Sequence, residues 1–270
     1  MRVGAHTRRL GLWRDLAFLV TPGLLRGRDT FGSTLIASPF SFGGLVGSRY
    51  GFGLDFSADG QQVSYNQSQR MADAGQVGID YMTMLAVANA DEAFATDGGP
   101  ARVASWNAAS TPGRDNPVMH IGRGDASNDW WVRATGSSAY SVGAGADSFP
   151  ADNSIGVGIG TYDRYGSPRV AIRSRMLDGG AIYKGTYDST SGSLGNYRGP
   201  VHIGNAGWPY AGQDRTHAGT VFMVAIWLRL LSDGELAMLL QDPFVLTRAV
   251  PRHATVDRVK AVRTPQGWKP

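Results

Sequence analysis

Hydrophobic residues recur at alternate positions along much of this chain, which is the period of a β-strand with one buried face. The longest such segment is Gln76–Asn89, where the apolar side chains fall at positions 77, 79, 81, 85 and 87. Shorter segments of the same kind follow, separated by turn-rich stretches. We predict further strands at 101–106, 118–123, 130–135, 154–163, 169–174 and 201–205.

Two segments between these strands indicate reversals of the chain. In Tyr50–Tyr65, Leu54 and Phe56 alternate with a polar residue, and Asp59-Gly60 is a strong two-residue turn signal. That segment predicts a β-hairpin. Ser137–Ala151 is rich in glycine, serine and alanine, and we predict a flexible loop there.

The period changes near the end of the chain. The apolar run Val221–Leu228 is too short to span a membrane and fits a strand buried on both faces. Ser232 and Glu235 have the spacing of a capping box, which marks the start of a helix. Leucines at 236, 239 and 240 follow at helical spacing before Asp242-Pro243. We predict a single short helix near 233–241, ended by the proline.

This C-terminal stretch carries a family resemblance. Its pattern, G-x-(apolar strand)-W-x-R-x-L-S-x-x-E-(apolar)-DPF, resembles the end of laminin-G-like, concanavalin A-like jelly-roll domains, particularly those of tailed-phage and environmental viral proteins. The strand segments above follow in the family's order. The resemblance implies an all-β sandwich over residues 10–247, with a first strand in 10–29 that pairs near the last one. Basic arms at 1–9 and 248–270 would flank it.

The composition narrows the possible chemistry. The chain has no cysteine, which excludes disulfides and a thiolate zinc site. No run of 18 apolar residues occurs, so we predict no contact with a membrane. A chain without disulfides or a recognisable signal peptide is expected to be made in a host cytoplasm.

Charge is distributed unevenly. Residues 1–28 contain six arginines and one aspartate, a net charge of +5, and residues 248–270 also carry +5. Since the whole chain is +4, the middle carries −6. Such ends are either solvated tails or arms that lie on an acidic partner. The predicted assembly contacts are Arg2, Arg8, Arg9, Arg248, Arg252, Arg258, Lys260 and Arg263.

Catalytic patterns are missing from the sequence. A glycosidase needs two carboxylates flanking the scissile bond. The only glutamates are Glu92 and Glu235, and Glu235 has a predicted capping role. The histidines have no ligand-like spacing, and no motif for binding nucleic acid is present. We therefore predict a protein that is not an enzyme and does not bind nucleic acid.

Aromatic residues in loops indicate a possible glycan site. The segment 205–214 combines Trp208, Tyr210 and Asp214 in one loop, and Trp130 with Trp131 forms a second patch. The alternative is that Trp208 belongs to a rigid turn and one of the paired tryptophans enters the core. We predict no cofactor. A calcium ion needs six to eight oxygens, of which Asp55, Asp59 or Asp163 could supply some.

Two functions remain. The viral resemblance, the lack of catalytic residues and the basic arms predict a structural subunit of a tailed-phage virion. Its partners would be other capsid or tail proteins and copies of itself. The alternative is a lectin-like adhesion module that recognises host surface glycans.

Overall fold

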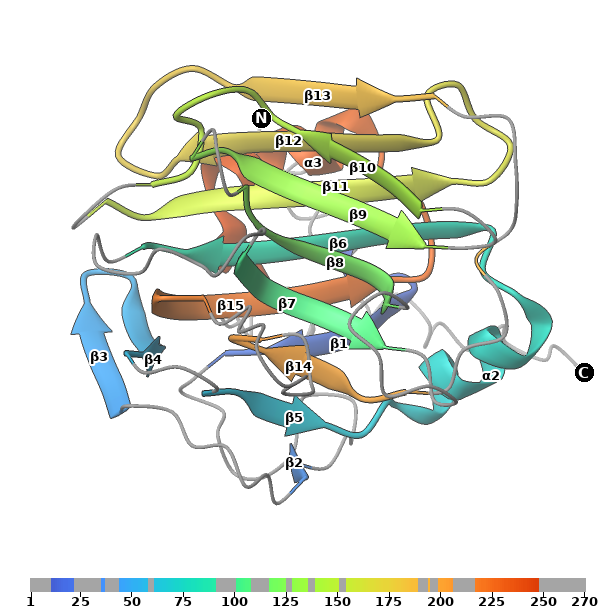
Figure 1. Cartoon of the computed structure of the whole chain (residues 1–270), viewed down its shortest axis with the longest axis horizontal. Coiled ribbons are helices and arrows are strands. Elements are labelled where there is room, and N and C mark those ends of the chain that lie inside the picture. Colours follow the sequence, from blue (N-terminus) through green and yellow to red (C-terminus); the bar gives the residue numbers. More distant parts are fainter. Residues whose placement is uncertain are drawn as a thin grey trace, which may run out of the picture.

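The chain forms two antiparallel β-sheets stacked face to face (Figure 1). The computed structural model describes residues 11–21, 35–36, 44–57, 61–90, 101–107, 117–124, 128–135, 139–150, 154–188, 194, 199–205 and 217–247. Within these ranges, no helix is long and apolar enough to cross a membrane.

Sheet A has eight strands in the order β13-β12-β11-β6-β15-β4-β3, with β1 also paired to β15. The bounds are β1 (Leu16–Val20), β3 (Gly44–Ser48), β4 (Gly51–Phe56), β6 (Tyr81–Ala88), β11 (Gly156–Asp163), β12 (Val170–Met176), β13 (Tyr183–Tyr187) and β15 (Gly219–Trp227). The pairing of β1 with β15 is the one that the family resemblance implied.

Sheet B has seven strands in the order β10-β9-β8-β7-β14-β5-β2. The bounds are β2 (Leu35–Ile36), β5 (Val63–Tyr65), β7 (Ala101–Asn107), β8 (Pro117–Arg123), β9 (Trp130–Thr135), β10 (Ala139–Gly143) and β14 (Val201–Ile203). The described helices are α2 (Gln69–Val77), α3 (Asp233–Gln241) and the 3₁₀-helix η2 (Pro243–Leu246). The predicted all-β sandwich is confirmed.

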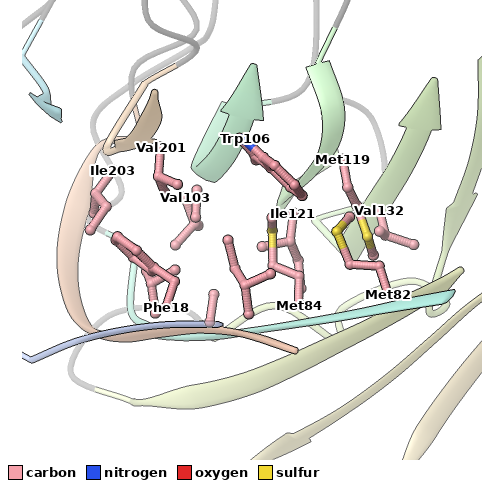
Figure 2. Packing of buried hydrophobic residues seen from close by; sticks show 14 of the residues in the cluster. Phe18, Met82, Met84, Val103, Trp106, Met119, Ile121, Val132, Val201 and Ile203 are labelled. Carbon is pink, nitrogen blue, oxygen red and sulfur yellow. The ribbon is translucent and has the colours of Figure 1, made fainter. Parts of the chain in front are cut away.

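The main core lies between the two sheets. Figure 2 shows Met82 and Met84 of sheet A pointing toward Trp106, Met119 and Ile121 of sheet B. All five side chains are fully buried. Because side chains alternate along a strand, every second residue of β6 enters this core.

A second core covers the opposite face of sheet A. There Leu85 and Val87 of β6 pack with the leucines of α3, namely Leu236, Leu239 and Leu240. Sheet A is therefore buried on both faces at its centre, and every residue of β15 is buried. This arrangement confirms the prediction made from the unbroken apolar run.

The predicted C-terminal helix is confirmed, together with its cap. Ser232 Oγ accepts a hydrogen bond from the backbone N–H of Glu235, and Glu235 Oε2 accepts one from the backbone N–H of Ser232. The sequence analysis missed α2, which is capped by the Ser68 hydroxyl. Val77 ends that helix with 89% of its surface exposed, so the strand predicted from Gln76 begins at Tyr81.

Two further predictions were wrong. The expected hairpin in Tyr50–Tyr65 does not form, because β4 belongs to sheet A and β5 to sheet B. Alternation on the two sides of a turn shows that each strand has an apolar face, but not that the two strands pair with each other. Here β4 and β5 lie in opposite sheets, and their apolar faces pack into the same core. The expected loop Ser137–Ala151 contains β10, which pairs with β9 despite its small side chains.

Candidate ligand-binding surface

Trp130 and Trp131 are consecutive residues at the start of β9, so their side chains lie on opposite faces of sheet B. Trp130 points into the main core, where its exposed fraction is 0% and its ring packs on Phe149 with 4.4 Å between centroids. The ring also lies over Gly158 of β11, where an added Cβ would come within 2.4 Å of it. The hypothesis that Trp130 binds a glycan is therefore corrected, because no face of its ring is open to a ligand.

Trp131 instead lies on the outer face of sheet B and is half-buried. Its ring stacks on the His120 imidazole, with 4.6 Å between centroids and 26° between the planes. Arg133 shares this face because it is two residues further along the strand. No described residue forms a hydrogen bond with the buried Nε of Arg133. We call Trp131, Arg133 and Ser141 of β10, which pairs with Arg133, the Trp131 surface.

The Trp131 surface continues into a row of polar side chains across sheet B. Strand register places them side by side in the order Ser141, Arg133, His120, Ser105, His202 and Ser64. From His120 onward the row is buried. His202 Nδ1 and Ser64 Oγ share a hydrogen bond of 2.7 Å. Burial lowers the pKa of His202 to about 4, so this imidazole is neutral at pH 7.

The glycan-site residues Trp208, Tyr210 and Asp214 lie outside the described residues, but the two ends of their segment are described. The backbone N–H of His217 donates a 2.7 Å hydrogen bond to the carbonyl of Gly204. The His217 ring is fully buried and meets Phe149 edge-on at 5.8 Å. Burial, together with the charge of Arg123, lowers the pKa of His217 to about 3, against a smaller upward effect from the Asn89 backbone. The framework therefore holds both ends of segment 206–216 in fixed positions.

The Trp131 surface and this loop root lie toward the same end of the sandwich. Trp131 pairs with Gly122, and the next pair along the two strands is Trp130 with Arg123. On the far side of β8, Arg123 pairs with Ala101 of β7, and the backbone N–H of Gly204 donates to the nearby carbonyl of Val103. Trp131, the outward-facing member of the second patch, therefore lies at the same end of sheet B as Gly204, with β8 and β7 between their strands.

The remaining candidate residues do not form a described site. All eight predicted assembly contacts lie outside the described residues, as does Asp59. Asp55 pairs with Thr220 at one end of sheet A, and Asp163 pairs with Tyr81 at the other. Within the described ranges, no three His, Asp or Glu side chains lie close enough together to hold a metal ion.

Comparisons with known proteins give likenesses of structure. No protein-family model matches the chain, and no curated protein matches it in sequence. The chain is similar to a Trypanosoma rangeli sialidase in complex with sialic acid, with a TM-score of 0.55 and 14% identity. That match covers 87% of this chain but only 34% of the sialidase.

Two more similar structures are a toxin domain and a carbohydrate-binding module. The binding domain of botulinum neurotoxin DC, in complex with SialylT, has a TM-score of 0.54 and 10% identity over 84% of this chain and 51% of that one. The CBM40 of Ruminococcus gnavus IT-sialidase has a TM-score of 0.48 and 12% identity over 69% of this chain and 95% of that one. The likenesses to the sialidase and the toxin domain show the fold alone. The relation to phage proteins stays a prediction.

Proposed function

We propose that this protein is a carbohydrate-binding, lectin-like module. The observation that carries the proposal is the Trp131 surface, where an aromatic ring, a guanidinium group and a hydroxyl share one face of sheet B. Two proteins of similar fold, the sialidase and the toxin domain, are described in complex with sialic acid and with SialylT. These two complexes support the lectin-like function, which was the alternative in the sequence analysis.

The Trp131 surface has the chemistry that a sugar requires. The C–H groups on one face of a pyranose ring pack well against an aromatic face, and an indole presents the largest one. The stacked His120 holds the Trp131 ring in place, so little side-chain entropy is lost on binding. Arg133 is half-buried on this face, and its guanidinium group supplies hydrogen-bond donors for a hydroxyl or carboxylate.

The proposal keeps the expectation that the protein is not an enzyme and needs no cofactor. Glu235 is held by Arg229 and by the cap of α3, and the hydrogen bond from Arg229 is the main reason its pKa is lowered. A carboxyl with a lowered pKa is a poor general acid at neutral pH. Glu92, the other glutamate, lies outside the described residues.

Replacing Trp131 tests the proposal directly. On an array of neutral and sialylated glycans, we expect the intact protein to bind at least one glycan and Trp131→Ala to weaken that binding about tenfold or more, since one aromatic platform contributes on the order of 1 kcal/mol or more. Trp131→Phe should retain part of it. Tyr187→Ala is the matched control, because it removes an exposed ring from an edge strand of sheet A.

The outcome against the proposal is equally specific. Thermal unfolding would first establish that Trp131→Ala is folded, since the change also removes the contact with His120. Glycan binding by that folded variant equal to the intact chain would place the site elsewhere. No binding to any glycan on the array would reject the lectin-like function.

A second candidate function is the structural subunit of a tailed-phage virion, and the hairpin of β3 and β4 favours it. Leu45, Val46 and Phe52 are large, apolar and exposed there, and β3 is one of the edge strands of sheet A. Exposed apolar edges pair readily with other chains. We propose copies of this chain or other virion proteins as partners. Self-association in sedimentation experiments that persists in Phe52→Ser would count against this hairpin as the contact.

A further inference from the structure

Two exposed tyrosines lie side by side at one end of sheet A, the opposite sheet from the Trp131 surface. Tyr81 is the first residue of β6 and follows Asp80, whereas Arg164-Tyr165 begins the turn between β11 and β12. The backbone N–H of Arg164 donates to the carbonyl of Asp80 at 2.8 Å, and Arg164 Nη1 donates to Asp80 Oδ1 at 2.9 Å. Each dipeptide thus contributes one charge and one ring, and the two charges neutralise each other.

The two rings lie next to each other and face solvent. Their centroids are 6.1 Å apart with 57° between the planes, and the exposed fractions are 41% for Tyr81 and 66% for Tyr165. The Arg164 guanidinium lies over the Tyr165 ring at 5.2 Å. We call these two rings the tyrosine platform.

The turn fixes the backbone that carries the platform. Asp163 Oδ1 accepts a hydrogen bond of 3.0 Å from the backbone N–H of Tyr165. The same carboxylate fills the space beside Gly166, where a Cβ would lie 2.4 Å from Asp163 Oδ2. The platform is therefore presented by a turn whose residues hold one another in place.

The fold does not need the two rings to be aromatic. The ion pair and the backbone hydrogen bonds already join the turn to β6, whereas neither ring belongs to a hydrophobic core. Exposed aromatic surface beside polar groups is typical of interaction sites. Rigid rings also bind with a small loss of conformational entropy.

We propose that the tyrosine platform is a second sugar-binding site, specific for a neutral pyranose. The rings offer faces for the C–H groups of a sugar, while the tyrosine hydroxyls and the free carboxylate oxygens beside them offer hydrogen bonds to its hydroxyls. Arg164 is already neutralised by Asp80, and Asp163 adds a negative charge. The local net charge is therefore negative, and it disfavours a sugar that carries a carboxylate.

Two sites on opposite sheets change how the chain binds a surface. Trp131 faces outward from sheet B, and the platform lies at the end of β6 and β11 in sheet A. Because the sites lie on opposite sheets, one chain could bridge sugars on two separate surfaces, whereas simultaneous engagement of one flat layer is not favoured by this geometry.

Nuclear magnetic resonance titration with lactose, a neutral probe, tests the platform separately from the Trp131 surface. The backbone amides of Tyr81 and Tyr165 report on one, and the Trp131 indole N–H reports on the other. We expect saturable shifts of the platform amides that are lost, or weakened at least tenfold, in Tyr165→Ala. Tyr165→Phe should keep most of the affinity, and Phe52→Ala, which removes an exposed ring from β4, should leave it unchanged. The amide spectrum of each variant also shows whether it is folded.

Each outcome decides between the two sites. Shifts at the platform that survive Trp131→Ala support the second site, whatever happens at the first. Lactose shifts confined to the Trp131 indole overturn the platform and leave the proposed function intact. Tighter binding of α2,3-sialyllactose than of lactose at the platform would overturn its neutral specificity, and no shift of the platform amides with either sugar would overturn the site.

Discussion

At the scale of single residues, Arg229 joins more of the chain than any sequence pattern indicated. Its guanidinium donates to Glu235 at 2.6 and 2.9 Å and to the carbonyls of Gly11, Arg14 and Leu230. The sequence showed the cap formed by Glu235 but gave no sign of this partner. Local spacing reveals contacts three or four residues apart, whereas Gly11 comes close only after β1 has paired with β15.

Removing Arg229 should therefore be costly. We expect Arg229→Ala to lower the free energy of unfolding by about 3 kcal/mol, because Glu235 would remain largely buried without its partner. Arg173→Ala is the control: it also breaks an ion pair with α3, but Asp233 has an exposed fraction of 85%, so the loss should stay below about 1 kcal/mol. Urea unfolding at pH 7 measures both, and equal losses would show that the Arg229 contacts contribute little.

The two tryptophans of β9 show the limit of sequence at this scale. Alternation predicted that one of them enters the core but could not decide which, because shifting the register by one residue exchanges the two faces. The choice is made by distant neighbours, since only the Trp130 position lies opposite Gly158. The sequence could therefore identify the Trp130-Trp131 pair as a candidate site but could not decide which of the two side chains is exposed.

At the scale of elements, the sequence predicted those with a long apolar run or a complete capping box. It did not predict the elements whose own signals are weak. Strand β15 and helix α3 carry their own signals, an unbroken apolar run and a capping box. Helix α2 and strand β10 have weaker ones: a serine cap without the acidic partner, and a strand of small residues. Their structure depends on neighbours, namely the main core for Met71 and the pairing with β9.

Strand β11 gives a test at the same scale. Its Gly156, Gly158 and Gly160 lie against bulky side chains of sheet B or its flanking loop. Gly158→Ala should lower the free energy of unfolding by about 1–3 kcal/mol, since the Cβ would overlap the Trp130 ring.

The matched control for Gly158→Ala is Gly234→Ala. Gly234 lies in α3 with nothing within 4 Å of the added Cβ, so the change should be neutral or stabilising by up to about 1 kcal/mol. Thermal unfolding compares the two variants. A Gly158→Ala protein as stable as the original chain would show that the sheets can separate to admit a methyl group.

At the scale of the whole molecule, two of the buried histidines, His202 and His217, make stability depend on pH. The folded-state pKa values are about 4 for His202 and about 3 for His217, both below the ordinary 6.5. At a pH between the folded-state pKa of each histidine and 6.5, that histidine is protonated in the unfolded chain but not in the folded one. Their contribution to stability is therefore fully present above pH 6.5 and is lost as the pH falls.

We expect the free energy of unfolding to drop by about 2 kcal/mol per histidine between pH 7 and 5, at about 1.4 kcal/mol for each pH unit below 6.5. Glu235 does not contribute to the change in stability between pH 7 and 5, because its stabilising ion pair is lost only as the pH falls below its ordinary pKa of 4.5. Urea unfolding across the window is the measurement. His202→Asn should reduce the slope by about half, and an unchanged slope would contradict the assignment.

The hydrogen bond between His217 and Gly204 has a consequence for how freely the chain between them can vary. It fixes the spacing of the two chain ends from which segment 206–216 departs, and the residues that make it belong to the framework. Mutations within 206–216 would leave these two anchors in place. An engineer could therefore graft a foreign peptide between the same two anchors.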